Sequence, residues 1–233
     1  MFARWVMTGA MALWGAVAAV AEDRPVVVEL FTSQGCSSCP PADAFLGLLA
    51  PRDDVIALAF HVDYWDYIGW KDIFGSPVNS ARQKAYAKHA GRRAIYTPQM
   101  IVDGKADVVG THPMDVTDLI AQYRETPRTI DLDIERVPPD LVEISARALR
   151  SHTKPLLVQI VRYQPEAHVK IDRGENAGHK LTYSNIVTDW KIVGEWDGAR
   201  PYSARVQAPG DAPVVVLIQR MGPGAIEAAA RLR

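Results

Sequence analysis

The sequence contains little of what marks several common classes of protein. It has only two cysteines in 233 residues, too few for the disulfide-dense scaffold of a small secreted domain. Lys and Arg number 26 against 27 Asp and Glu, so the formal net charge is -1 and no large basic field is present to bind nucleic acid. Hydrophobic residues make up 48% and charged residues 23%, a balance that excludes an intrinsically disordered chain. We therefore expect a globular protein with no nucleic-acid partner.

Long hydrophobic runs are also scarce, and the one candidate lies at the N-terminus. After Arg4, the chain from Trp5 to Val20 carries no charge. This stretch is shorter than the ~20 apolar residues that a membrane span needs. Ala19-Val20-Ala21 has the small-x-small pattern that signal peptidase cuts. We expect a signal peptide over residues 1–21, cleavage after Ala21, no stable membrane span after cleavage, and a periplasmic or secreted mature protein. A retained N-terminal anchor is the alternative.

From residue 24 to residue 126, short β-branched runs alternate with helix-like stretches. Val26–Phe31 and Val55–Phe60 are typical of buried strands, and Ala42–Ala50 between them has the apolar spacing of a helix. Gln99–Val109 has Asp103-Gly104 at its centre and predicts a hairpin with a type I′ turn. This βαβ…ββα order predicts an α/β domain in which a helix connects parallel strands.

From residue 127 to residue 233 the pattern changes to strict alternation. Ile130, Leu132 and Ile134 alternate with acidic residues, which is typical of a half-buried strand. Further short strand candidates, separated by Pro, Gly and Asp, are Leu141–Ala146, Leu156–Tyr163, His168–Asp172, Leu181–Tyr183, Ile186–Val193, Tyr202–Gln207 and Val214–Arg220. This second half is predicted to be an accessory β-rich domain, an antiparallel β-sandwich-like fold.

The two cysteines lie at the junction of the first predicted strand and helix. Pro40 and Pro41 lack N–H donors and mark the first helical turn. Cys36 would then sit at the helix start, where free N–H groups and the helix dipole stabilise a thiolate, with Cys39 one turn along and close enough for a disulfide. The alternatives are an inert disulfide or half of a metal site. Zinc would need a second Cys or His pair at metal spacing, and none follows, so we predict no metal site and no cofactor.

An aromatic-rich stretch follows the second predicted strand. Loops at the C-terminal ends of strands form the binding crevices of open α/β sheets. We hypothesise that Tyr64, Trp65 and Trp70 line a substrate groove beside Cys36. The alternative is that these rings cap the core or the seam between the two halves.

Several strings resemble a known family. Glu29–Asp43 (ELFTSQGCSSCPPAD), His61–Tyr67 (HVDYWDY) and Tyr96–Gln99 (YTPQ) are similar to a bacterial family of secreted thioredoxin-like proteins catalogued as domain of unknown function 1223. The resemblance extends from about Pro25 to the C-terminus and includes Arg173–Asn176 (RGEN). It implies a thioredoxin-like fold for the first half and an exported location, and it names no substrate.

The resemblance also implies roles for individual residues. Cys36 would be the attacking thiol and Cys39 the buried resolving thiol. Pro98 matches a proline that thioredoxin-like proteins hold cis beside the disulfide, which turns the Thr97 backbone toward the sulfurs to pair with substrate. Glu29 approximates a buried carboxylate that accepts the proton of the resolving thiol, and desolvation would raise its pKa into the range of a general base. The alternative is a Glu29 that faces solvent or pairs locally.

Two classes of function follow from these observations. The first is an exported thiol–disulfide oxidoreductase that acts on protein or small-thiol substrates, with a redox partner in the envelope; oxidase, isomerase and reductase directions all remain open. The second is a non-enzymatic binding protein, either a thiol-dependent copper carrier or an envelope adaptor. Two thiolates suit Cu(I), and His61 or His112 could add a ligand.

Overall fold

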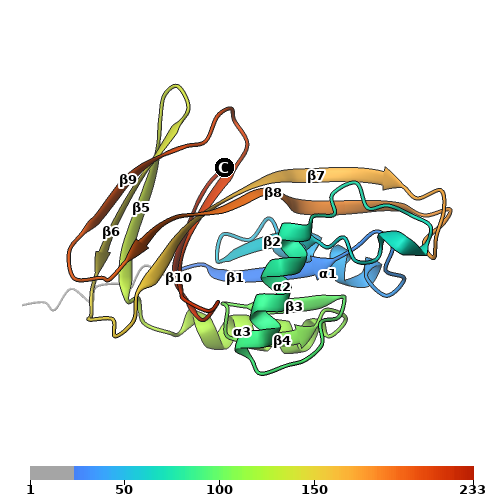
Figure 1. Ribbon diagram of the computed structural model, residues 1–233, viewed down its shortest axis with the longest axis horizontal. Coiled ribbons are helices and arrows are strands. Elements are labelled where there is room, and N and C mark those ends of the chain that lie inside the picture. Colours follow the sequence, from blue (N-terminus) through green and yellow to red (C-terminus); the bar gives the residue numbers. More distant parts are fainter. Residues whose placement is uncertain (1–23) are drawn as a thin grey trace, which may run out of the picture.

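The computed structural model describes residues 24–233, which form two β-sheets and three α-helices (Figure 1). The predicted signal peptide, residues 1–21, lies outside the described residues. No helix within residues 24–233 is long and apolar enough to cross a membrane.

The first half of the chain contributes all three α-helices and the strands that flank them. Its elements are β1 (Val26–Thr32), α1 (Pro40–Leu49), β2 (Val55–His61), the short 3-10 helix η1 (Asp66–Ile68), α2 (Pro77–His89), β3 (Gln99–Val102), β4 (Ala106–Val109) and α3 (Pro113–Arg124). The second half contains only strands: β5 (Ile130–Val137), β6 (Leu141–Ala148), β7 (Leu156–Lys170), β8 (Lys180–Trp196), β9 (Tyr202–Gln207), β10 (Val214–Arg220) and β11 (Ile226–Leu232).

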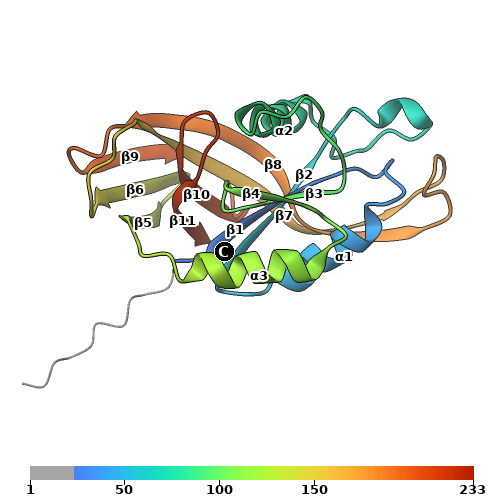
Figure 2. The ribbon, with the colours of Figure 1, turned by 90° about the horizontal axis from the view of Figure 1, so that it is seen from below.

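Strands from both halves form one mixed sheet. Its order is β11-β10-β7-β8-β2-β1-β3-β4, and the remaining strands form a three-stranded sheet, β5-β6-β9. β1 pairs parallel with β2 and antiparallel with β3, while β2 pairs parallel with β8 through Ala59 and Ile186. Figure 2 shows α1 and α3 on one side of this sheet and α2 on the other.

This architecture overturns the predicted fold class, an α/β thioredoxin-like domain followed by an antiparallel β-sandwich-like domain. The structure is mostly β, with an eight-stranded mixed sheet and a separate sheet of only three strands. The prediction failed because β7 and β8 are 15 and 17 residues long and pair along their whole length, so they reach the edge of β2. Each was predicted as two shorter strands. In β7 the predicted break falls at the exposed residues after Tyr163, and in β8 it includes Asn185, whose φ is 50°.

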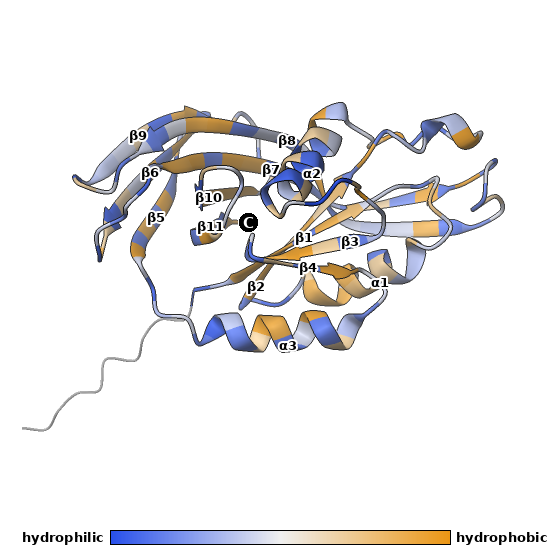
Figure 3. Ribbon diagram, turned by 60° about the horizontal axis from the view of Figure 1, so that its bottom comes forward, coloured by the Kyte–Doolittle hydropathy of each residue, from blue (hydrophilic) through white to orange (hydrophobic). Residues whose placement is uncertain are grey.

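The central strands are buried on both faces, which explains their continuous apolar runs. Val28 and Leu30 of β1 pack with α1 and α3, whereas Val27 and Phe31 point to the opposite face and pack with Tyr86 of α2. A further apolar cluster fills the space between the two sheets, with residues of β5 and β6 against β7 and β10. Figure 3 shows the resulting pattern, in which the central strands are hydrophobic and α3 carries both hydrophobic and hydrophilic residues.

The predicted hairpin is confirmed. β3 and β4 pair antiparallel, and Asp103 and Gly104 between them have φ values of 56° and 66°, as a type I′ turn requires. A Cβ atom on Gly104 would lie 2.4 Å from the Gly224 carbonyl oxygen, so this position needs glycine for space as well as for its conformation. Asp103 is fully buried and forms an ion pair with Arg24.

One charged residue interrupts the apolar run of β1 and is fully paired. Glu29 accepts hydrogen bonds from Arg82 of α2 at 2.9 Å and 2.7 Å and from the Tyr86 hydroxyl. Arg82 also donates to Gln159 at 3.1 Å and lies over the Trp190 ring. The ion pair therefore joins β1 and α2 to β7 and β8, on the face of the sheet opposite α1.

Replacing Arg82 with Met leaves the buried Glu29 carboxylate without its counter-charge. We expect Arg82→Met to lower the free energy of unfolding by about 3–5 kcal/mol in urea titrations, and Glu29→Gln added to it to restore part of the loss. The matched control is Arg205→Met, which breaks the exposed Arg205–Glu143 pair at 3.0 Å and should change stability by less than about 1 kcal/mol. Equal losses in both variants would contradict this account.

Candidate redox site

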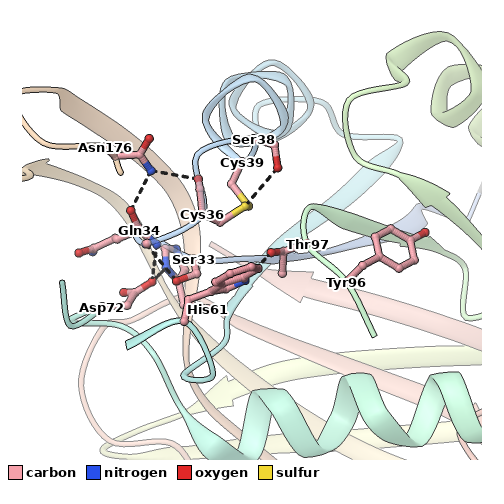
Figure 4. Close-up of a disulfide and its surroundings, with 12 residues drawn as sticks. Ser33, Gln34, Cys36, Ser38, Cys39, His61, Asp72, Tyr96, Thr97 and Asn176 are labelled. Atoms are coloured by element: carbon pink, nitrogen blue, oxygen red, sulfur yellow. Dashed lines mark hydrogen bonds and ion pairs between the residues drawn. A yellow bond between two sulfur atoms is a disulfide. The ribbon is translucent and has the colours of Figure 1, made fainter. Parts of the chain in front are cut away.

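Cys36 and Cys39 form a disulfide in the loop between β1 and α1. Their Cα atoms are 5.4 Å apart. Cys36 exposes 3% of its surface and Cys39 none, while Ser37 and Ser38 between them are exposed. Figure 4 shows the bond together with Ser38, Thr97 and Asn176. The disulfide therefore lies directly beneath a short exposed turn.

Cys39, and not Cys36, caps the helix. α1 begins at Pro40, and its first two residues are prolines without N–H groups. The next two N–H groups, of Ala42 and Asp43, both donate to the Cys39 carbonyl oxygen, at 2.9 Å and 3.0 Å. The expectation that free N–H groups at the helix start surround Cys36 is therefore wrong. The polar atom that contacts the Cys36 sulfur is the Ser38 hydroxyl oxygen, 3.5 Å away.

Behind the disulfide loop lies a group of buried polar side chains whose grouping was not predicted, although Thr32, Asp43 and His61 lie in the strings that carried the resemblance. They come from the end of β1, from α1, from the end of β2, from the loop after η1 and from β8. None exposes more than 5% of its surface. We call them the buried polar cluster: Thr32, Asp43, His61, Asp72 and Tyr183.

Asp72 connects this cluster to the disulfide loop. Its Oδ2 atom lies 2.7 Å from His61 Nδ1 and accepts the Gln34 N–H at 2.8 Å. The Phe74 N–H donates to the other oxygen at 2.8 Å. Because a carboxylate faces Nδ1, that nitrogen carries a hydrogen.

Asp43 is the least satisfied member of the cluster. Neither of its carboxylate oxygens has a hydrogen-bond partner within residues 24–233, and the same holds for His61 Nε2, Thr32 Oγ1 and the Tyr183 hydroxyl. Burial raises the pKa of Asp43 to about 7, against smaller lowering effects from His61 and the Thr32 hydroxyl. Asp72 raises the pKa further. Burial also raises the pKa of Tyr183, and the nearby Asp43 and Asp72 carboxylates raise it further. This phenol is therefore neutral near pH 7.

Trp65 and Trp70, the two tryptophans predicted to line a groove, form hydrogen bonds with segments near the disulfide. Trp65 Nε1 donates to Thr97 Oγ1 at 2.7 Å, and Trp70 Nε1 donates to Gln34 Oε1 at 2.8 Å. The Thr97–Pro98 peptide bond is cis, as the resemblance implied. The groove that these rings were proposed to line stays a prediction.

The other two predicted site residues point away from the sulfurs. The Tyr64 hydroxyl donates to Gln83 Oε1 of α2 at 3.1 Å, and burial raises the pKa of Tyr64 to about 12. Glu29 lies on the sheet face opposite α1, in its ion pair with Arg82. Figure 4 shows Thr97 near the disulfide, and the two tryptophans bind Thr97 and Gln34, whereas Tyr64 and Glu29 have their partners on α2.

The loop between β7 and β8, in the second half of the chain, forms hydrogen bonds with the disulfide loop. Asn176 is 5% exposed and its side-chain amide donates to the carbonyl oxygens of Gln34 at 2.9 Å and Cys36 at 3.0 Å. In the same loop, Gly174 has a φ of 79°, and a Cβ atom there would lie 3.1 Å from the Cβ of Trp70. The string RGEN that carried the resemblance contains this contact, but its role was not predicted.

The site offers few groups for a metal ion. Within residues 24–233 no set of three or more His, Cys, Asp or Glu side chains could hold one. His61, considered as an additional copper ligand, contacts Asp72 through Nδ1. His112, the other histidine considered, lies 3.5 Å from Asp115 at the start of α3.

Replacing Asp43 with Asn should change how stability depends on pH. A carboxyl group whose folded pKa is raised from 3.8 to about 7 stabilises the fold only while protonated, so its contribution is lost as pH rises toward 7. We expect the urea midpoint of Asp43→Asn to exceed that of the wild type by more at about pH 8 than at about pH 4.5. The control is Asp54→Asn: Asp54 has a pKa lowered from 3.8 because Arg52 donates to it, so its contribution is lost only below about pH 4 and its midpoint should differ from that of the wild type by a constant amount between about pH 4.5 and about pH 8. Parallel curves for all three proteins would contradict the assignment.

Comparison with known proteins places the chain in a family. Residues 27–219 match the family described as protein of unknown function (DUF1223), whereas no curated protein matches. The chain is similar to the crystal structure of protein AGR_C_4864 from Agrobacterium tumefaciens, with 33% identity, a TM-score of 0.77, and coverage of 91% of this chain and 95% of that one. HBP35 of Porphyromonas gingivalis shares the fold at 14% identity and a TM-score of 0.60, over 90% of this chain and 75% of that one. The protein belongs to the DUF1223 family.

Proposed function

We propose that the protein is an exported thiol–disulfide oxidoreductase that uses Cys36 and Cys39 on protein or small-thiol substrates. The observation that carries this proposal is a disulfide just beneath an exposed turn, with a buried carboxyl group one helical turn beyond Cys39 that has no hydrogen-bond partner in the described part of the chain. A structural role is a weaker explanation, because the stabilisation by a disulfide grows with the length of the loop that it closes. This one joins residues only three apart in sequence.

The buried polar cluster supports the proposal independently. A buried polar group without a partner costs about 1–3 kcal/mol of stability, and such groups collect where chemistry requires them. Within residues 24–233, the cluster has atoms without a hydrogen-bond partner on Thr32, Asp43, His61 and Tyr183. A purely structural disulfide would not require these polar groups.

The exchange reaction assigns different roles to the two sulfurs. A substrate thiolate attacks the Cys36 sulfur, the Cys36–Cys39 bond breaks, and its electron pair leaves on Cys39. Cys36 is the attacked atom because it is the more exposed of the two, at 3% against 0%. Oxidation of a substrate dithiol continues as a second thiolate of the substrate attacks the substrate sulfur of the mixed disulfide, which forms the substrate disulfide and releases the Cys36 thiolate. The direction depends on the reduction potential of the pair relative to its partner.

Single cysteine variants test this order of attack. We expect Cys39→Ser to form a mixed disulfide with added glutathione disulfide at Cys36, detected as a mass increase of the intact protein. Cys36→Ser should react at least about tenfold more slowly, because the remaining thiol of Cys39 is fully buried. An unreactive Cys39→Ser, in a folded protein, would sink the proposed function.

Substrate access should depend on the Asn176 contact. Asn176→Ala leaves the carbonyl oxygens of Gln34 and Cys36 without their donor, and the loss of about 1–2 kcal/mol of local stability should raise the rate of disulfide reduction by dithiothreitol about tenfold. The matched control is Asn185→Ala, which removes a buried hydrogen bond of 2.9 Å to the Ala57 carbonyl of β2. Equal acceleration in the control would show that global destabilisation, and not loosening of the disulfide loop, is the cause.

A further inference from the structure

Reduction of the disulfide would leave a negative charge on a sulfur atom that is buried. The electron pair of the broken bond leaves on Cys39, whose exposed fraction is 0%. Burial strongly disfavours an isolated thiolate. A proton must therefore be available to Cys39 from a neighbouring side chain.

Asp43 is placed to supply that proton. It is the acidic residue of α1, four positions after Cys39, and its N–H donates to the Cys39 carbonyl oxygen at 3.0 Å. Side chains at this spacing share one helix face with Cβ atoms about 5–6 Å apart. Both side chains are turned into the protein, at 0% and 5% exposure. Both carboxylate oxygens of Asp43 are without a hydrogen-bond partner among the described residues.

We propose that Asp43 gives a proton to the Cys39 sulfur when the disulfide is reduced and takes it back when the disulfide forms. This role rests on the proposed function. In the reducing direction, an external thiolate bonds to the Cys36 sulfur, the Cys36–Cys39 bond breaks, and the Cys39 thiolate receives the proton of the Asp43 carboxyl group. In the oxidising direction, the Asp43 carboxylate removes the proton from the Cys39 thiol. The thiolate then attacks the mixed disulfide at Cys36 and releases the substrate thiolate.

The elements packed against Asp43 present two kinds of group to it. His61 of β2 and Asp72 are the titratable partners, and Thr32 of β1 and Tyr183 of β8 add hydroxyls. Among residues 24–233, His61 Nε2 has no hydrogen-bond partner. Asp72 holds the His61 ring through Nδ1 at 2.7 Å. His61 and Asp72 are therefore positioning residues, and burial keeps the pKa of Asp43 at about 7, in the range where it both gives and takes a proton.

The pH profile of reduction tests this role. The rate constant for reduction by dithiothreitol is measured from about pH 5.5 to about pH 9 and divided by the thiolate fraction of the reagent. For the wild type, the corrected rate should fall as pH rises through about 7, because Asp43 loses its proton there. Asp43→Asn should lack this inflection and react about tenfold more slowly near pH 6. Asp54→Asn, at the far end of β2, should keep the wild-type profile.

The pKa of the Cys39 thiol supplies a readout that a merely structural role would not change. In reduced Cys36→Ser, the thiolate absorbance of Cys39 is titrated with and without Asp43→Asn, and circular dichroism verifies that both proteins are folded. We expect Asp43→Asn to lower the pKa of Cys39 by about one unit, because it removes the negative charge that faces the thiolate.

The outcomes separate the two proposals. A wild-type disulfide that dithiothreitol and glutathione leave unchanged would overturn the oxidoreductase function, and the role of Asp43 with it. Normal exchange with the same pH profile and the same Cys39 pKa in Asp43→Asn would overturn only the role of Asp43.

Discussion

Where β8 pairs with β2, through Ala59 and Ile186, the two halves of the chain become one sheet, and everything around the disulfide depends on this pairing. It brings Tyr183 against His61, with ring centroids 4.8 Å apart. It also extends the hairpin of β7 and β8 past the end of β2, so that Asn176 reaches the carbonyl of Cys36. The second half of the chain is therefore part of the site.

Glu29 and Asp43 are buried carboxyl groups on opposite faces of the sheet, and they differ in their partners. Glu29 has Arg82 and Tyr86 as partners, and this network joins strands to α2. Asp43 has no such partner among the residues that the structure describes, and burial raises its pKa to about 7. A buried carboxyl group with a full set of partners contributes to the packing of the fold, whereas burial without such partners raises the pKa of a carboxyl group.

Several local features were predictable because neighbouring residues determine them. The hairpin of β3 and β4 follows from Asp103-Gly104, since the type I′ turn needs two residues with positive φ. Pro40 and Pro41 mark the start of α1 because they lack N–H donors. The long strands β7 and β8 were missed, since their pairing continues through exposed stretches where the apolar alternation stops.

The sequence by itself determined the position of the two cysteines between a strand and a helix, and their spacing allows a disulfide. Only the tertiary structure decided which carboxyl group stands near them. Glu29 and Asp43 are both acidic residues beside apolar neighbours, and no local pattern distinguishes their roles. The side of the sheet that each one faces, and whether an arginine 53 residues away reaches it, depends on how strands and helices pack. Burial and long-range pairing give each group its surroundings, and neither can be read from the residues next to it.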